Sequence, residues 1–180
     1  MKKYIIILAC LLIKLNTGAQ IYSPKDEQQA VSFIIKNFGL SVNGTLTGLQ
    51  GRIVFNPANL STATFKVTVD VGTINTGNSS RDSHLKKEDY FNAAVFQKIN
   101  IVSSKITTGN SPATYLFEGV VSIKGTNKSI SFPFTASPIA DGYIFKGSFK
   151  INRRDFKVGG NSMVLSDNLT INLNISTKKS

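Results

Sequence analysis

The fold is decided by Leu169-Thr170-Ile171-Asn172-Leu173-Asn174-Ile175-Ser176, a stretch that alternates apolar and polar residues without an error. A period of two predicts a β-strand with one apolar and one polar face. Seven other stretches show the same alternation. Their apolar positions are Val31, Phe33 and Ile35; Ile53 and Phe55; Phe65, Val67 and Val69; Ile99 and Ile101; Phe117, Val121 and Ile123; Ile130, Phe132 and Phe134; and Tyr143, Phe145, Phe149 and Ile151. The chain is therefore predicted to be all-β.

Eight strands with one apolar face form either a sandwich or a barrel, and the apolar side chains favour the barrel. Phenylalanine dominates with 12 residues, there is no tryptophan, and Gly119 and Gly147 lie on the inward faces. An eight-stranded barrel is either filled by its side chains or wide enough for one slender ligand. Glycines among large residues favour the second case, so we expect an eight-stranded antiparallel barrel with a hollow interior.

A barrel that spans an outer membrane also alternates, but it has aromatic girdles at both ends of its strands. Here the aromatic residues lie in mid-strand, and the last strand ends in Lys178-Lys179. This class is therefore excluded.

Turn residues mark the strand ends. Asp141-Gly142 predicts a hairpin, and Pro133 predicts an edge, a bulge or weak pairing because proline donates no hydrogen bond. Several glycines, Gly39, Gly44, Gly48 and Gly51, predict a bend between the first two alternating stretches.

Residues 1–19 are predicted to be a secretory signal peptide, followed by one barrel domain over residues 20–180. Lys2 and Lys3 precede the apolar run Tyr4 to Ile13, and small residues end at Ala19. We expect an exported protein, periplasmic or secreted. A lipoprotein cleavage at Cys10 is less favoured because it would cut inside the apolar run. Loss of Cys10 removes the single cysteine and with it any disulfide or thiolate site.

The chain is basic, with a net charge of +11. Without the three lysines of the signal, the mature charge is 11 − 3 = +8. Such a protein is attracted to anionic membrane surfaces. Nucleic acid is not expected as a partner, because the basic residues are spread along the chain in runs of at most two.

A different pattern, without alternation, occupies residues 76–91. Gly77 ends a strand, Ser79 or Ser80 can cap a helix, and Leu85 and Phe91 can be buried. We predict a short helix around residues 79–90 that lies across a mouth of the barrel.

The segment Arg81-Asp82-Ser83-His84-Leu85 holds the only histidine of the chain. Nucleophilic catalysis would require a hydroxyl or thiol that His84 can deprotonate and an acid to orient the ring. A metal site would require several ligands. We favour hydrogen bonds that tie the helix to the barrel over a contact with a ligand headgroup, and both over catalysis. No catalytic residue or metal ligand is predicted. Arg153-Arg154 can form a charge pair at a strand end or meet an anionic headgroup.

Several motifs resemble the YceI-like family. They cover about residues 24–176 in the expected order: Val31-Ser32-Phe33 with Gly39 and Gly44; Thr73-Ile74-Asn75-Thr76-Gly77; Arg81-Asp82-Ser83-His84-Leu85; Tyr90-Phe91; Val121-Ser122-Ile123-Lys124-Gly125 with Lys128; and Asn152-Arg153-Arg154-Asp155-Phe156. The chain departs from the family pattern at Asn37, where histidine is frequent, and at Lys157, where glycine often follows.

The resemblance implies an exported, lipocalin-like β-barrel that binds polyisoprenoids or other long amphiphilic lipids and is not an enzyme. No cofactor is expected beyond such a bound lipid, for example an isoprenoid quinone. The polar headgroup is expected to meet Arg81, His84, Arg153 or Arg154. The lumen residues expected to hold the tail are Phe33, Ile35, Phe55, Phe65, Val67, Ile101, Phe117, Val121, Phe132, Phe134, Phe145 and Phe149.

Two alternative functions stay open at this point. One is a secreted structural or adhesion module with a filled barrel and no ligand. The other is a hydrolase or isomerase that uses His84.

Overall fold

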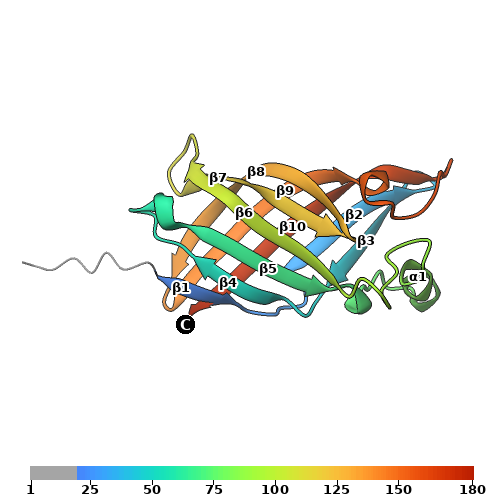
Figure 1. Cartoon of the computed structure of the whole chain (residues 1–180), viewed down its shortest axis with the longest axis horizontal. Coiled ribbons are helices and arrows are strands. Elements are labelled where there is room, and N and C mark those ends of the chain that lie inside the picture. The colour runs from blue at the N-terminus through green and yellow to red at the C-terminus, as the bar shows by residue number, and fades with distance from the viewer. Residues whose placement is uncertain (1–19) are drawn as a thin grey trace, which may run out of the picture.

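A computed structural model describes residues 20–180, and in this part of the chain ten strands form one antiparallel sheet. Figure 1 shows an elongated barrel with a short helix beside one end. The strands are β1 (Ile21–Pro24), β2 (Val31–Asn37), β3 (Leu40–Leu46), β4 (Gln50–Val54), β5 (Thr64–Asp70), β6 (Lys98–Thr108), β7 (Thr114–Ile123), β8 (Thr126–Ile139), β9 (Gly142–Asn152) and β10 (Leu165–Lys179). The helices are α1 (Ser79–Leu85) and three 3₁₀ turns: η1 (Leu60–Thr62), η2 (Val71–Thr73) and η3 (Arg153–Phe156).

The barrel closes because β1 pairs on one side with β4 and on the other with β10. The closed ring runs β1-β4-β5-β6-β7-β8-β9-β10 and returns to β1, which makes eight strands. β2 pairs with the first half of β10, and β1 pairs with its end, so β1 and β2 together flank one side of that strand. β3 extends the sheet beside β2. The predicted eight-stranded antiparallel barrel with an inserted helix is confirmed.

β3 lies where glycines predicted only a bend, and the contact between Phe33 and Gly44 explains why. These residues face each other across β2 and β3. A Cβ atom on Gly44 would lie 2.2 Å from the Phe33 ring, so the ring occupies the space of the missing side chain. Gly44 therefore stands in β3 where a regular strand would have an apolar side chain, and the alternation that would have marked this strand is interrupted.

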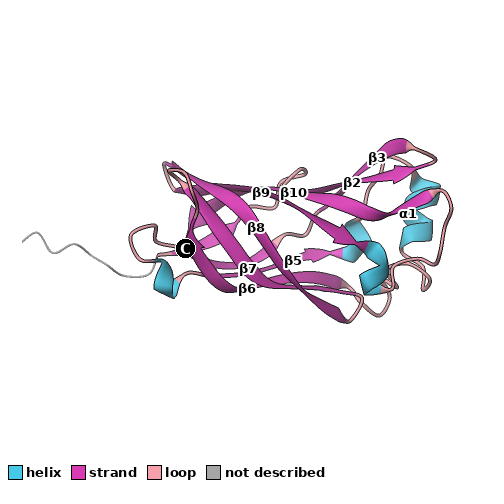
Figure 2. Cartoon of the chain, turned by 90° about the horizontal axis from the view of Figure 1, so that it is seen from above, coloured by secondary structure: helices cyan, strands magenta, loops and turns pink. Residues whose placement is uncertain are grey.

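The barrel loosens at the end where α1 lies. β8 pairs with β9 only from Phe134 onward, immediately after Pro133, which confirms the weak pairing predicted there. On the opposite wall, β3 meets the chain after β5 through a single bridge between Thr45 and Asn75. At this end, the α1 end, the wall therefore consists of two leaves, β9-β10-β2-β3 and β5-β6-β7-β8 (Figure 2).

Helix α1 begins and ends differently from the prediction. Its N-cap is Asn78, whose side-chain oxygen accepts a hydrogen bond from the backbone N–H of Arg81, instead of Ser79 or Ser80. The helix ends at Leu85, and turns continue the chain to residue 96. No helix within residues 20–180 is long and apolar enough to cross a membrane.

The opposite end of the barrel, the plugged end, is filled by aromatic rings. Phe55 is fully buried and makes edge-on contacts with Tyr115, Tyr143 and Phe145 at centroid distances of 5.1–5.2 Å. Burial, followed by the effect of neighbouring Tyr143, raises the pKa of both Tyr22 and Tyr115 above the ordinary value. The aromatic rings thus close the lumen at this end.

Candidate ligand-binding site

An apolar cavity runs through the middle of the barrel, between the plugged end and the α1 end. Its volume is about 90 Å³. The lining is made by Val31, Leu46, Leu49, Ile53, Phe65, Val67, Thr68, Val69, Ile99, Ile101, Phe117, Val121, Ile123, Phe132, Phe134, Phe145, Lys146, Gly147, Phe149, Ile151, Ile171, Leu173 and Ile175.

Most of the residues predicted to face the lumen line this cavity. Nine do so: Phe65, Val67, Ile101, Phe117, Val121, Phe132, Phe134, Phe145 and Phe149. The other three lie around it. Phe55 belongs to the aromatic plug, Phe33 covers Gly44, and Ile35 packs at the α1 end. Whether the nine contact a ligand stays a prediction, but their common position follows from the alternation alone.

The sequence suggested that Gly119 and Gly147, on the inward face, leave the barrel hollow. In the structure, neighbouring atoms occupy the space beside both glycines. A Cβ on Gly119 would lie 2.3 Å from the Val102 carbonyl oxygen and 2.7 Å from the Phe117 ring. A Cβ on Gly147 would lie 2.9 Å from the Phe132 ring. These glycines therefore make room for neighbouring rings, and Phe132 uses it to stack between Phe117 and Phe149.

Of the four residues predicted for the headgroup, Arg81 is held within its own segment. Its Nε donates to the Thr76 hydroxyl at 2.7 Å, and its Nη2 donates to the Thr76 carbonyl at 3.0 Å. Asp82 accepts from the backbone N–H of Thr76 at 2.9 Å. The bonds fasten the start of α1 to Thr76, which lies just before the helix, whereas the sequence favoured bonds that tie the helix to the barrel itself.

Arg153 is also committed to the protein. Its guanidinium is buried and donates to the carbonyls of Ser166, Val158, Gly160 and Leu165 at 2.9–3.4 Å. Its Nη2 also forms an ion pair with Asp167 at 2.6 Å. A guanidinium has five N–H donors, so this network leaves Arg153 none to offer a headgroup. The structure places it as the anchor of the loop between η3 and β10.

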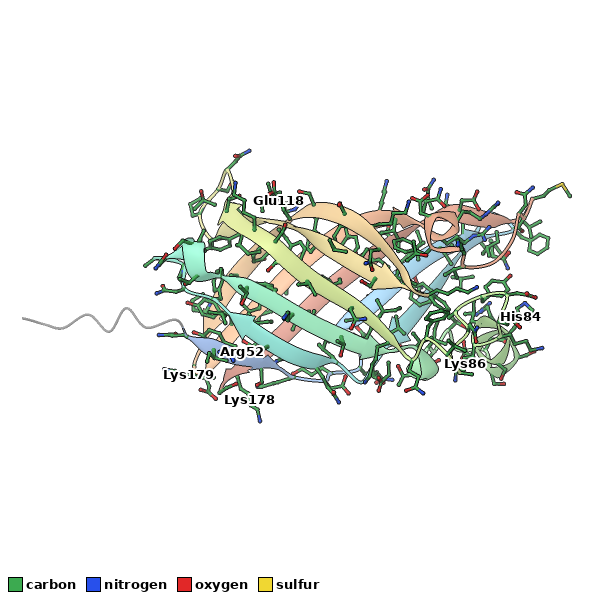
Figure 3. The ribbon with its side chains drawn as sticks, viewed as in Figure 1. Arg52, His84, Lys86, Glu118, Lys178 and Lys179 are labelled. Atoms are coloured by element: carbon green, nitrogen blue, oxygen red, sulfur yellow. The ribbon has the colours of Figure 1, made fainter. Side chains whose placement is uncertain are left out.

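His84 and Arg154 come together at the rim of a shallow surface depression, and both are exposed. The His84 ring packs against Tyr90 at a centroid distance of 4.8 Å, and Figure 3 shows His84 at the α1 end of the molecule. Lys124 and Lys157 supply two more cations, whereas Glu88 and Asp89 supply two acids. Of the predicted headgroup residues, these two are the ones left accessible at the α1 end.

Residues 20–180 contain no group of three or more histidine, cysteine or acidic side chains placed to hold a metal ion. The contact with Tyr90 gives His84 a structural partner, and its use in catalysis stays an untested hypothesis.

Sequence reasoning missed the residues that close the α1 end. Phe156 and Val158, in and after η3, pack against Val121 and Ile123 of β7. η3 also contacts β8 and β10, and thus fills the gap where β8 and β9 part. Phe156 is the last residue of the motif Asn152-Arg153-Arg154-Asp155-Phe156, and this motif was the signal that could have pointed to it. The segment does not alternate, however, so the sequence did not indicate that Phe156 is buried.

The chain has clear relatives. The YceI-like domain family matches residues 22–177. A UPF0312 protein of Shewanella denitrificans is 23% identical over 172 residues, which cover 88% of each chain. The solved structure of BcnA from Burkholderia cenocepacia has a TM-score of 0.76 and 21% identity, and the match covers 86% of this chain and 94% of that one. A polyisoprenoid binding domain from Saccharophagus degradans, implicated in plant cell wall breakdown, has a TM-score of 0.69 and 13% identity over 88% and 98% of the two chains. These structures share the fold.

Proposed function

The chain belongs to the YceI-like family, and from this premise we propose that it is an exported lipid carrier or store that holds one long apolar ligand in its barrel lumen. The proposed ligands are polyisoprenoids, isoprenoid quinones and lipids of the fatty-acyl type. The polyisoprenoid-binding domain among its structural neighbours supports this class. We propose no catalysis and no cofactor other than the lipid.

The observation that carries the proposal is the apolar cavity inside the barrel, between its two ends. A polyisoprenoid tail has no polar group, so it needs only apolar contact along its length. Burial contributes about 25 cal/mol per Å² of apolar surface removed from water. Apolar side chains from strands all round the barrel line the cavity, so an apolar tail held there is removed from water along its length.

The two ends of the barrel suggest an orientation for the ligand. Phe55 and its aromatic neighbours close one end with apolar rings, which suit the terminus of a tail. Accessible His84 and Arg154 lie at the α1 end, which suits an anionic or hydrogen-bonding headgroup. We propose that the tail enters from the α1 end and stops at the plug.

The alternative, an adhesion module with a filled barrel, is less well supported because a filled barrel would have no lining of this kind. A hydrolase or isomerase that uses His84 has no supporting contact beyond the histidine itself. An enzyme of this kind would lose its activity on replacement of His84 by alanine, whereas a lipid carrier keeps its fold and its lumen lipid and loses at most part of its affinity for the headgroup.

The proposal is tested by filling the lumen without changing the wall. Val67 lies in the cavity lining on β5, and its register neighbour on β6 is Ile101. Val67→Phe places a ring in the cavity, so a fluorescent polyene fatty acid that binds the wild type should bind at least about tenfold more weakly. The matched control is Val102→Phe, which makes the same change on an exposed position of the adjacent strand.

Fluorescence titration of the three proteins, each checked for its thermal midpoint, separates the outcomes. Loss of binding in Val67→Phe alone supports a lumen ligand. Equal binding by Val67→Phe and the wild type would place the ligand elsewhere and refute the proposal.

A further inference from the structure

Four apolar side chains project from the outer tip of the α1 end, and none of them belongs to the lumen. Phe38 and Leu40 lie at the turn between β2 and β3 with exposed fractions of 72% and 73%. Met163 is fully exposed, and Val164 is partly exposed. The two segments are joined, because the Phe38 N–H donates to the Val164 carbonyl at 2.9 Å. We call these residues, Phe38, Leu40, Met163 and Val164, the apolar tip.

Phe38 is poorly suited to its turn. Asn37 pairs with Leu40, so Phe38 and Gly39 form a two-residue hairpin loop, and both have positive φ angles of 51° and 76°. This type of turn favours Asn-Gly, and an aromatic residue in the left-handed region is uncommon. Phe38 is therefore unfavourable for the local backbone and also unfavourable for solvation. Neither the turn nor the core explains its presence.

The charge around the apolar tip is positive. Three exposed cations lie near the apolar tip along the chain: Lys36 comes before the turn, and Arg154 and Lys157 come before the loop that carries Met163, with Asp155 between them. Arg154 and Lys157 also border the depression that contains Lys124, Glu88 and Asp89. Arg153 on the same segment is neutralised by Asp167. An apolar point surrounded by cations matches the interface of a bilayer that contains anionic lipids.

The size of the apolar tip argues against a second copy of the chain as its partner. A stable protein interface buries about 800 Å² on each side with some 20 to 30 residues, whereas this patch has four projecting side chains at the narrow end of the molecule. A small convex point penetrates a lipid surface more readily than it covers another protein.

We propose that the apolar tip inserts into the surface of an anionic bilayer and brings the α1 end of the barrel to the membrane. The proposal rests on the proposed lipid-binding function, because it gives a long apolar ligand a path between membrane and lumen that avoids water. Phe38 is the central residue of this docking surface. Lys36, Arg154 and Lys157 contact the phosphates of the lipid headgroups.

The test uses Phe38→Asn, which removes the aromatic side chain and supplies the residue that the turn prefers. Flotation with phosphatidylcholine vesicles that contain phosphatidylglycerol should show binding weakened roughly tenfold or more, with a thermal midpoint equal to or above that of the wild type. Ile139→Ser is the matched control, since Ile139 is a partly exposed apolar residue at the plugged end. Pure phosphatidylcholine vesicles and added salt should weaken wild-type binding, because the headgroup contacts are ionic.

Lipid content of the same preparations, measured by solvent extraction, separates this proposal from the proposed function. Weakened flotation of Phe38→Asn with an unchanged lumen ligand supports the apolar tip as a membrane contact. Equal flotation of Phe38→Asn and the wild type overturns it, whether or not a lumen ligand is found. A wild type that is dimeric where Phe38→Asn is monomeric, with equal flotation, also overturns it and assigns the surface to a second copy.

Discussion

At the scale of single residues, Arg153 shows how a motif can be recognised and its role misassigned. Two adjacent arginines after a strand suggest a basic rim, but only Arg154 is exposed, with one hydrogen bond to Asn161 at 3.2 Å. Arg153 turns inward and donates to the carbonyls of Val158 and Gly160 in the loop before β10 and of Ser166 at the start of β10. The sequence contains no signal that separates the two, because the loop that Arg153 binds is irregular and comes later in the chain.

We predict that Arg153→Lys lowers the free energy of unfolding by roughly 2–4 kcal/mol, because a lysine has three donors and cannot reproduce the planar set of bonds. Urea unfolding measures the change. Arg154→Lys is the control, and its effect should stay within about 0.5 kcal/mol. Equal stability of the two variants would contradict the anchoring role.

The buried tyrosines of the plugged end predict a dependence on alkaline pH. Burial raises the pKa values of Tyr22 and Tyr115 above the unfolded value of 10.0. The unfolded state therefore loses these protons first, and the stabilisation is complete below about pH 10 and declines as pH rises through the folded-state pKa values. The free energy of unfolding of the wild type should fall more steeply above about pH 10 than that of Tyr22→Phe/Tyr115→Phe. Parallel pH profiles from urea unfolding would show that the two hydroxyls do not contribute.

At the scale of elements, alternation predicted eight of the ten strands, β2 and β4 to β10, but it missed β1, β3 and η3. β1 has four residues, too few for a pattern to stand out. In β3, positions 40, 42, 44 and 46 share one face, and three of them are the apolar residues Leu40, Val42 and Leu46. The fourth is Gly44, which interrupts the series because the Phe33 ring lies over it. η3 has no period to detect, and its role depends on the gap between β8 and β9.

We predict that Phe156→Ala both destabilises the protein and opens this gap. Phe156, the last residue of η3, has an exposed fraction of 1% and packs against Val121 and Ile123 of β7, so its truncation should cost about 3–5 kcal/mol. A fluorescent lipid should also leave the variant faster than the wild type, as measured by stopped-flow transfer to acceptor vesicles. The change Phe38→Asn, at an exposed phenylalanine of the same end, should not reduce stability. An unchanged release rate in Phe156→Ala would mean that the ligand does not leave between β8 and β9.

At the scale of the whole molecule, the barrel has one plugged end and one divided end, and its cavity lies between them. The alternating sequence specified which residues face inward, but a filled and a hollow barrel have the same pattern. The difference depends on how rings pack against one another, as when Phe132 takes the space beside Gly147. The positive charge could be predicted from the sequence because it depends only on composition. The apolar tip could not, because it forms only where the turn between β2 and β3 lies beside Val164 in the folded chain. The predicted signal peptide lies in residues 1–19, outside the described part of the chain.

The most direct test of the central claim is native mass spectrometry of the protein purified from its native host without detergent, followed by solvent extraction and identification of what is released. A lumen ligand predicts a folded species heavier than the polypeptide by the mass of one long apolar lipid, and Val67→Phe should lack this species while Val102→Phe retains it. A folded wild type at the mass of the bare polypeptide, which stays so after incubation with lipid vesicles, would contradict the claim that the barrel is a lipid container.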